Sequence, residues 1–236
     1  MCTPQPQALP TDFGQARQSF ATRRVPRAAM QALVAGAHRP QVGDLVLARV
    51  RQTGQHRNVE LVNGRKASLF ADDLVILAYG NRYAPDQFEA LVPTDLGPCD
   101  MVAGGGLAAR EVARHDAMSR PTQILPLGLL ADAEGRVLKL RDHALPLPAQ
   151  PAQGATGTAV YVVCGTSMNA GKTHSAAMLV RGLRNQGLRV AAFKATGTGS
   201  GNDLWKLHDA GATQVLDFVD AGLPSTYGVP VPELEH

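Results

Sequence analysis

Residues 165–173 are the feature of this sequence that most restricts how the chain can fold. They read Gly-Thr-Ser-Met-Asn-Ala-Gly-Lys-Thr, and they follow the continuous apolar run of residues 158–164. A run of this kind is typical of a strand buried on both faces of a parallel sheet. After the loop, Ala176, Leu179, Val180 and Leu183 recur at the spacing of one helix face. The sequence therefore predicts a buried strand, a glycine-containing loop and an amphipathic helix in succession.

The residues beyond this helix continue the alternation of strands and helices. We expect strands at residues 188–193 and 214–219, with a helix at residues 203–210 between them. Strands that alternate with helices indicate a parallel sheet with right-handed crossovers. The predicted fold class is therefore α/β, with a parallel-sheet domain at residues 158–233 that follows a small N-terminal β-rich (α+β) domain.

The N-terminal half has the pattern of short strands joined by turns. We expect strands at residues 44–50, 58–62, 66–70 and 74–79, within a β-rich domain at residues 41–142. Asn63-Gly64 lies between two of these runs, and this dipeptide is the strongest short signal for a hairpin. A small barrel or curled sheet is the natural interpretation. Within the same domain, the residues after Gly106 are expected to form a helix that runs to about Met118.

The remaining segments are assigned from their composition. Residues 1–40 are interpreted as a tail followed by one short helix at residues 26–36, because Pro26 precedes a run of good helix formers. Residues 143–157 contain Pro146, Pro148 and Pro151, so they are expected to form a linker between the domains. Residues 234–236 resemble the start of an expression tag, which is not expected to belong to the fold.

Charge and composition exclude several classes of function. The formal net charge is only +3, and the basic residues are scattered apart from a short cluster at Arg23, Arg24 and Arg27, so no nucleic-acid partner is expected. No stretch approaches the roughly 20 apolar residues that span a bilayer, and the N-terminus does not look like a signal peptide. No membrane association is therefore expected, and a cytoplasmic location is assumed. Three cysteines without a CxxC pair predict neither a disulfide framework nor a zinc site.

The loop at residues 165–173 has the chemistry of a phosphate-binding site. Backbone N–H groups and the positive end of the following helix can meet a concentrated negative charge. The ammonium of Lys172 is expected on the β- and γ-phosphate oxygens, and the hydroxyl of Thr173 is expected to coordinate Mg²⁺. The predicted cofactors are ATP and Mg²⁺. The residues expected to contact the cofactor in this loop are Gly165, Thr166, Ser167, Met168, Asn169, Ala170, Gly171, Lys172 and Thr173.

The spacing of the loop differs from the usual GxxxxGK[ST] form, because its first glycine is Gly165 and not residue 166. Residues 161–173 and 179–194 together resemble the opening of dethiobiotin synthetase and its P-loop relatives. That family uses the same early-glycine loop. The resemblance covers about residues 158–227 and continues through Lys194, Gly199, Ser200 and Asp203. Ser167 and Asn169 stand where that family often has acidic residues, so the substrate is expected to differ.

The resemblance implies roles for three residues outside the loop. Lys194 would face the phosphates or a substrate carboxylate as a catalytic residue, Ser200 would contribute to cofactor binding, and Asp203 would help to hold Mg²⁺. Lys194 could instead be a solvated strand end, and Asp203 could be only a first-turn acid of its helix. Family members have further strands and a base-recognition loop, so this domain is expected to be incomplete at its C-terminus. Such relatives often dimerise, which leaves a homodimer open.

These observations favour an ATP-dependent enzyme, similar to a ligase or synthetase, that activates a small carboxylate or carbamate by phosphoryl transfer. Its partners would be a nucleotide and a small-molecule substrate. One alternative is a nucleotide-binding regulatory or assembly module without turnover, in which the nucleotide switches docking of the β-rich domain. Another is a P-loop relative that binds a phosphorylated cofactor such as an acyl-CoA. The sequence leaves the substrate and the choice between ATP and GTP open.

Overall fold

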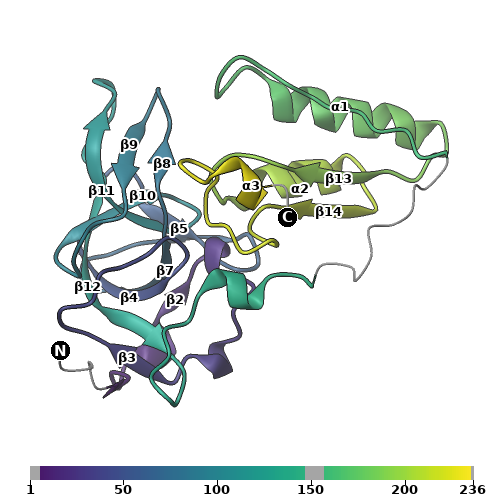
Figure 1. The fold of residues 1–236 in the computed structure, drawn as a ribbon. Coiled ribbons are helices and arrows are strands. Elements are labelled where there is room, and N and C mark those ends of the chain that lie inside the picture. Colours follow the sequence, from purple (N-terminus) through teal and green to yellow (C-terminus); the bar gives the residue numbers. More distant parts are fainter. Residues whose placement is uncertain (1–5, 147–156, 235–236) are drawn as a thin grey trace.

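The computed structural model describes residues 6–146 and 157–234, which form a strand-rich part and a smaller part with helices (Figure 1). The strands of the first part are β1 (Gln7–Ala8), β2 (Arg17–Gln18), β3 (Ala32–Val34), β4 (Leu45–Gln52), β5 (Asn58–Glu60), β6 (Lys66–Ser68), β7 (Leu74–Tyr79), β8 (Arg82–Tyr83), β9 (Phe88–Leu91), β10 (Cys99–Ala103), β11 (Leu107–Arg114) and β12 (Thr122–Ala131). The second part contains α1 (Lys172–Asn185), β13 (Ala191–Lys194), α2 (Gly201–Asp209), β14 (Gln214–Asp217) and α3 (Val231–Leu234).

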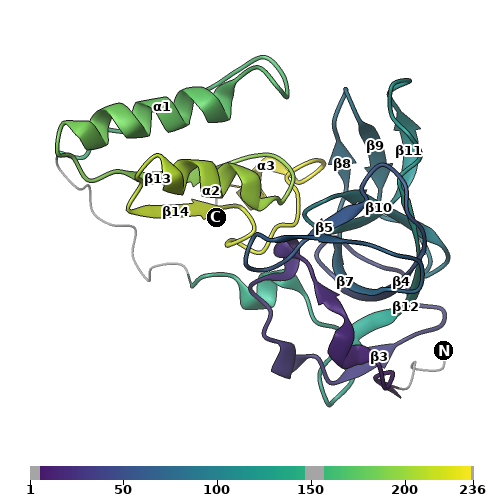
Figure 2. The same cartoon turned by 180° about the vertical axis from the view of Figure 1, so that it is seen from behind.

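The strands of the first part close into a barrel. β12 pairs with β4, β4 with β7, β7 with β11, β11 with β10, and β10 with β12 again, so the hydrogen-bonded pairs form a ring. Within the ring only β7 and β11 run parallel. Closing a sheet in this way removes exposed edges from its strands. β8 and β9 extend β11 beyond the barrel, as the two views in Figures 1 and 2 show.

The barrel strands β4 and β7 are apolar on both faces because both faces are covered. One set of side chains, which includes Val46, Val75 and Tyr79, belongs to the core inside the ring. The alternate set, which includes Leu47 and Ile76, packs against the N-terminal segment and the residues that follow β12. β3 and β2 also join this sheet, by pairing with β12 and β7. Residues from the segment 13–34 therefore contribute to the cores on both faces of this sheet.

The second part is a βαβ unit with two additional helices, α1 and α3. β13 and β14 form a parallel pair joined through α2, and α1 packs on α2. Their shared core consists of the buried residues Ala177, Val180, Leu207, Ala210 and Ala212. In the described part of the chain, β13 and β14 pair only with each other. α3 is a single short turn near the end of the described residues.

The predicted fold class is wrong. The structure is dominated by antiparallel pairing in a mixed sheet of ten strands, and the parallel-sheet domain expected at residues 158–233 contains only a two-stranded parallel sheet. Residues 158–164, expected to be its buried central strand, have no strand assignment and are largely exposed, with Val160 82% exposed and Val162 78% exposed. Apolar composition alone does not make a strand, because backbone groups also need a neighbouring strand with which to pair.

Two expected helices are absent as well, while the predicted hairpin turn is present. Residues 26–36 form a 3-10 turn at Arg27–Ala29 followed by β3, and the residues after Gly106 form β11 in place of a helix. β5 and β6 pair in antiparallel register across the turn at Asn63 and Gly64, and Gly64 has the positive φ of 83° that such a turn requires. Among the residues described, no helix has the length and apolar character needed to cross a membrane.

Candidate nucleotide-binding site

The predicted phosphate loop leads directly into α1. Asn169 and Gly171 both adopt positive φ values, 63° and 88°, and these left-handed residues turn the chain into the helix at Lys172. Gly171 is the N-cap, and no side chain of the described residues caps the helix there. Ser175 N–H is the first amide bonded within the helix, to the carbonyl of Gly171 at 2.9 Å. The amides of the first turn are therefore free to meet an anion.

Lys172 folds back over the loop. Its ammonium donates a hydrogen bond to the carbonyl of Ser167 at 2.5 Å. Its methylene groups pass next to Gly165, where an added Cβ would lie 2.9 Å from Lys172 Cγ. This close approach gives a physical reason for the early glycine, because a side chain at residue 165 would displace the lysine. The loop thus contacts both the stem and the ammonium of Lys172.

The rest of the loop is open to solvent and contacts the barrel at one point. The residues from Gly165 to Gly171 are exposed, whereas Thr173 in the first turn of α1 is half-buried. The side-chain amide of Asn169 donates to the carboxylate of Asp86, which lies between β8 and β9. The hydroxyl of Ser167 bonds within the loop, to the carbonyl of Met168 at 3.0 Å. Three further loop residues are exposed, Thr166, Met168 and Ala170. A ligand can therefore approach this part of the loop from solvent.

Lys194 and Asp203 are brought together. Lys194 is the last residue of β13, and its ammonium forms an ion pair with the carboxylate of Asp203 in the first turn of α2. The side chains are 20% and 30% exposed, so Lys194 is neither a free strand end nor fully buried. Its ammonium also lies 5.7 Å from the centre of the Phe218 ring. This arrangement neutralises both charges.

Ser200 is directed toward the barrel. Its hydroxyl donates to Glu60 Oε2 at 3.2 Å, and the N–H of Gly201 donates to the same oxygen at 2.9 Å. Glu60 is a buried residue of β5, and it supplies the carboxylate at the N-terminus of α2. A carboxylate at this end of a helix satisfies free amides and interacts favourably with the helix dipole. The structure therefore engages Ser200 with a protein group at the position where the sequence predicts a cofactor contact.

A second ion cluster at the same edge was not found by sequence reasoning. Arg23 Nη2 lies 2.7 Å from Asp217 Oδ1 and 2.9 Å from Asp220 Oδ2, and the Asp217 side chain is 0% exposed. Burial raises the pKa of Asp217 above its ordinary value, while the charge of Arg23 and its hydrogen bond act in the opposite direction. In the β13–β14 register Asp217 is opposite Lys194, so the cluster lies at the carboxyl end of the parallel pair. The sequence signals for it were the basic residues at 23–27 and Asp217, an acid after a hydrophobic strand that could also be a strand-end turn residue, but nothing in the sequence pairs them.

The residues present fit a magnesium ion only in part. Thr173 offers a hydroxyl in the first turn of α1, and Mg²⁺ commonly combines one or two protein oxygens with phosphate oxygens and water. Asp203, the second predicted ligand, is bound to Lys194 and would have to leave that ion pair. In the described ranges 6–146 and 157–234, no group of three or more His, Cys, Asp or Glu side chains is arranged to hold a metal ion. Any Mg²⁺ would therefore depend on the nucleotide for most of its ligands.

Comparisons of the chain with protein-family models, with curated proteins and with solved structures found no match. The resemblance of residues 158–227 to dethiobiotin synthetase therefore depends on the motif residues themselves. Any function of this segment is therefore inferred from the loop geometry and from the ion pairs around it.

Proposed function

We propose that residues 165–173 bind the phosphates of Mg-ATP, and that the chain is an ATP-dependent enzyme that activates a small carboxylate or carbamate by phosphoryl transfer. One observation carries the proposal. The ammonium of Lys172 is held by the Ser167 carbonyl, inside an exposed loop that leads into a 14-residue helix without a side-chain cap. A cation, free amides and a helix N-terminus gathered at one turn form an anion site.

A bound triphosphate would replace the contact of Lys172 with the loop carbonyl. The ammonium would then neutralise charge on the phosphate oxygens, and the amides at the start of α1 would donate to them. Mg²⁺, when bound, would neutralise charge that develops on the transferred phosphoryl group, and Thr173 would hold it through its hydroxyl. Lys194 would leave Asp203 to meet the substrate carboxylate. Catalysis of this kind depends on positioning and charge neutralisation.

Contacts between the two parts of the chain favour a second candidate, a nucleotide-binding regulatory module. Arg23 from the barrel binds Asp217 and Asp220, and Glu60 from the barrel caps α2. Both contacts lie at the carboxyl end of β13 and β14, where ligands of open α/β sheets bind. A nucleotide that changed this edge would therefore change how the barrel is held.

Titration calorimetry of Mg-ATP with the wild-type chain and Lys172→Ala tests the binding proposal. Loss of one charge-assisted hydrogen bond to phosphate is expected to weaken binding by about tenfold or more. Arg181→Ala is the matched control, because Arg181 is an exposed cation on α1, beyond the first turns of the helix. Its affinity should equal that of the wild type. Equal affinity of Lys172→Ala and wild type would refute the site.

Turnover separates the two candidate functions. ADP release that depends on an added small carboxylic acid supports the enzyme, whereas tight Mg-ATP binding without any turnover supports the regulatory module. Competition between CoA and ATP for the loop would indicate the third class, a relative that binds a phosphorylated cofactor.

A further inference from the structure

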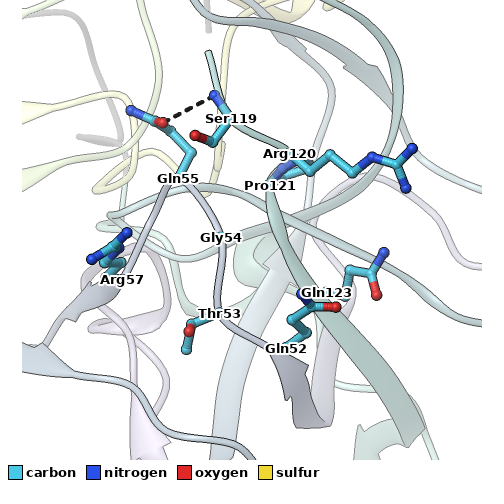
Figure 3. Close-up of a pocket in the computed structure, with 9 residues that line it drawn as sticks. All are labelled: Gln52, Thr53, Gly54, Gln55, Arg57, Ser119, Arg120, Pro121 and Gln123. Carbon is cyan, nitrogen blue, oxygen red and sulfur yellow. Dashed lines mark hydrogen bonds between the residues drawn. The ribbon is translucent and has the colours of Figure 1, made fainter.

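A polar pocket lies on the barrel, where the end of β4 and the start of β12 separate (Figure 3). The two strands are in register at Gln52 and Gln123, and the register shifts between Gln123 and Ile124. A shift of this kind is a β-bulge, which bends a strand and redirects its side chains. The residues that follow β4 then cross close to the chain at Arg120 and Pro121. The pocket has a volume of about 500 Å³, within the range of small-molecule sites.

Gly54 allows this close crossing. An added Cβ at Gly54 would lie 2.2 Å from the carbonyl oxygen of Arg120 and 2.5 Å from that of Pro121. The crossing is fixed by hydrogen bonds on both sides, because Gly54 N–H donates to Thr122 Oγ1 at 2.9 Å and Gln55 N–H donates to the Arg120 carbonyl at 2.8 Å. These hydrogen bonds hold the backbone in place at the crossing, and the side chains around the crossing line the pocket.

The walls combine carboxamides and hydroxyls with two cations. Gln52, Gln55 and Gln123 each present an amide, and Thr53 and Ser119 present hydroxyls. These groups both donate and accept hydrogen bonds. Of the described residues, no carboxylate lines the pocket, and Pro121 is its only apolar side chain. Such a lining suits a ligand rich in hydroxyl groups and does not suit a flat apolar ligand.

The two cations, Arg57 and Arg120, have no ion-pair partner among the described residues. In Figure 3 the side chains of Arg120, Gln52 and Gln123 lie on one side of the Gly54 backbone, and Arg57 lies on the other. All four side chains belong to exposed residues, so a ligand can reach them from solvent. A guanidinium presents a planar fork of donors that matches phosphate or carboxylate. Arg120 therefore offers a group suited to an anion on the same side of the pocket as the two amides.

We propose that this pocket binds a small polyhydroxylated anion, such as a sugar phosphate or a sugar acid, with its anionic group on Arg120 and its hydroxyls on Gln52 and Gln123. The site is on the barrel and uses none of the residues of the loop at 165–173. The pocket and the proposed nucleotide site share no residue, so the test of one site does not decide the other.

Titration calorimetry of the full chain tests the pocket with four probes, which are glucose 6-phosphate, gluconate, glucose and inorganic phosphate. Saturable binding of either sugar anion, with weaker binding of glucose and of inorganic phosphate, is expected. Comparing glucose 6-phosphate with gluconate shows whether the anionic group is a phosphate or a carboxylate. Binding of neither sugar anion, or equal binding of glucose, would overturn the proposal.

Variants then locate the binding. Arg120→Ala and Gln123→Ala should each weaken the sugar anion that binds, by about tenfold for the charge and less for the amide. Lys172→Ala should leave this affinity unchanged, which excludes binding at the phosphate loop. Arg65→Ala is the control for general charge, because Arg65 is an exposed cation of the β5–β6 turn outside the pocket. A loss in Arg65→Ala equal to that in Arg120→Ala would show nonspecific attraction and refute the site.

Discussion

Replacing Arg23 with alanine should destabilise the junction between the barrel and the βαβ unit. Arg23 is the partner that the structure provides for Asp217, whose side chain is 0% exposed, and the Arg23 side chain is itself only 12% exposed. Breaking a buried pair by removing one partner costs about 3–5 kcal/mol, because an uncompensated charge stays buried. Asp217 keeps hydrogen bonds from the N–H groups of Val219 and Asp220, at 2.8 and 3.3 Å. We therefore expect the lower end of that range, about 3 kcal/mol.

The loss of stability in Arg23→Ala should depend on pH. Burial already raises the pKa of Asp217, and removing Arg23 takes away the main influence that lowers it. A carboxyl group whose pKa is raised in the folded state loses stability as the pH rises from its unfolded value, near 4, through its folded value. Arg23→Ala should therefore differ from wild type more at pH 7 than at pH 5, where the carboxyl of the variant is more often protonated.

Urea denaturation followed by tryptophan fluorescence measures both effects. Trp205 is the single tryptophan, and it lies on α2 beside the Gly64 turn of the barrel, so it reports on the junction. With an m-value of about 2 kcal/mol/M, a loss of about 3 kcal/mol lowers the midpoint by about 1.5 M. Arg39→Ala, an exposed cation without an ion pair in the described residues, is the control.

A double-mutant cycle with Asp217→Asn then isolates the pair. The cost of Arg23→Ala should be smaller when the Asp217→Asn substitution is already present, since residue 217 then carries no charge and Asp220 is the carboxylate that loses Arg23. Equal costs in both backgrounds, or a midpoint within error of wild type at pH 7, would refute the reasoning.

Three further predictions follow from single contacts. Glu60→Ala should cost about 1–2 kcal/mol in the same urea assay, because Gly201 N–H and Ser200 Oγ lose their acceptor at the start of α2, and Glu60→Gln should restore part of it. Gly54→Ala should lower the melting temperature, since its Cβ would lie 2.2 Å from a backbone oxygen, whereas Gly14→Ala, with nothing within 4 Å, should not. Burial raises the pKa of Cys99 to about 12, so a thiol reagent at pH 8 should modify the exposed Cys164 quickly and Cys99 only after unfolding.

Local signals in the sequence predicted the elements that depend on local geometry. The Asn63-Gly64 turn requires positive φ, which few residues tolerate, and the structure has the hairpin there. The apolar runs at 44–50 and 74–79 correspond to β4 and β7. α1 begins within the predicted strand, loop and helix segment, at Lys172. These elements were identifiable because their residues alone restrict the backbone.

Elements that depend on distant partners could not be predicted in this way. Residues 107–114 are rich in alanine and suggest a helix, yet pairing with β7, β9 and β10 makes them a strand. The sequence of segment 158–164 resembles a buried strand, but the segment pairs with no strand in the described part of the chain, so the parallel sheet there has two strands. The contacts of Arg23 with Asp217 and of Glu60 with α2 join residues more than 140 positions apart, and no motif marks them.

The charges at the carboxyl edge of β13 and β14 determine how a nucleotide could be accommodated there. Lys194 and Asp203 neutralise each other, and Arg23 faces two carboxylates, so with Glu60 this edge carries an excess of negative charge. A triphosphate placed against the same edge would be repelled unless a cation accompanied it. Chelation of Mg²⁺ should therefore reduce ATP affinity well beyond the loss seen in Lys172→Ala alone. If ATP bound equally well with EDTA as with Mg²⁺, the phosphates could not lie at this edge, and Lys194 would have no role in the reaction.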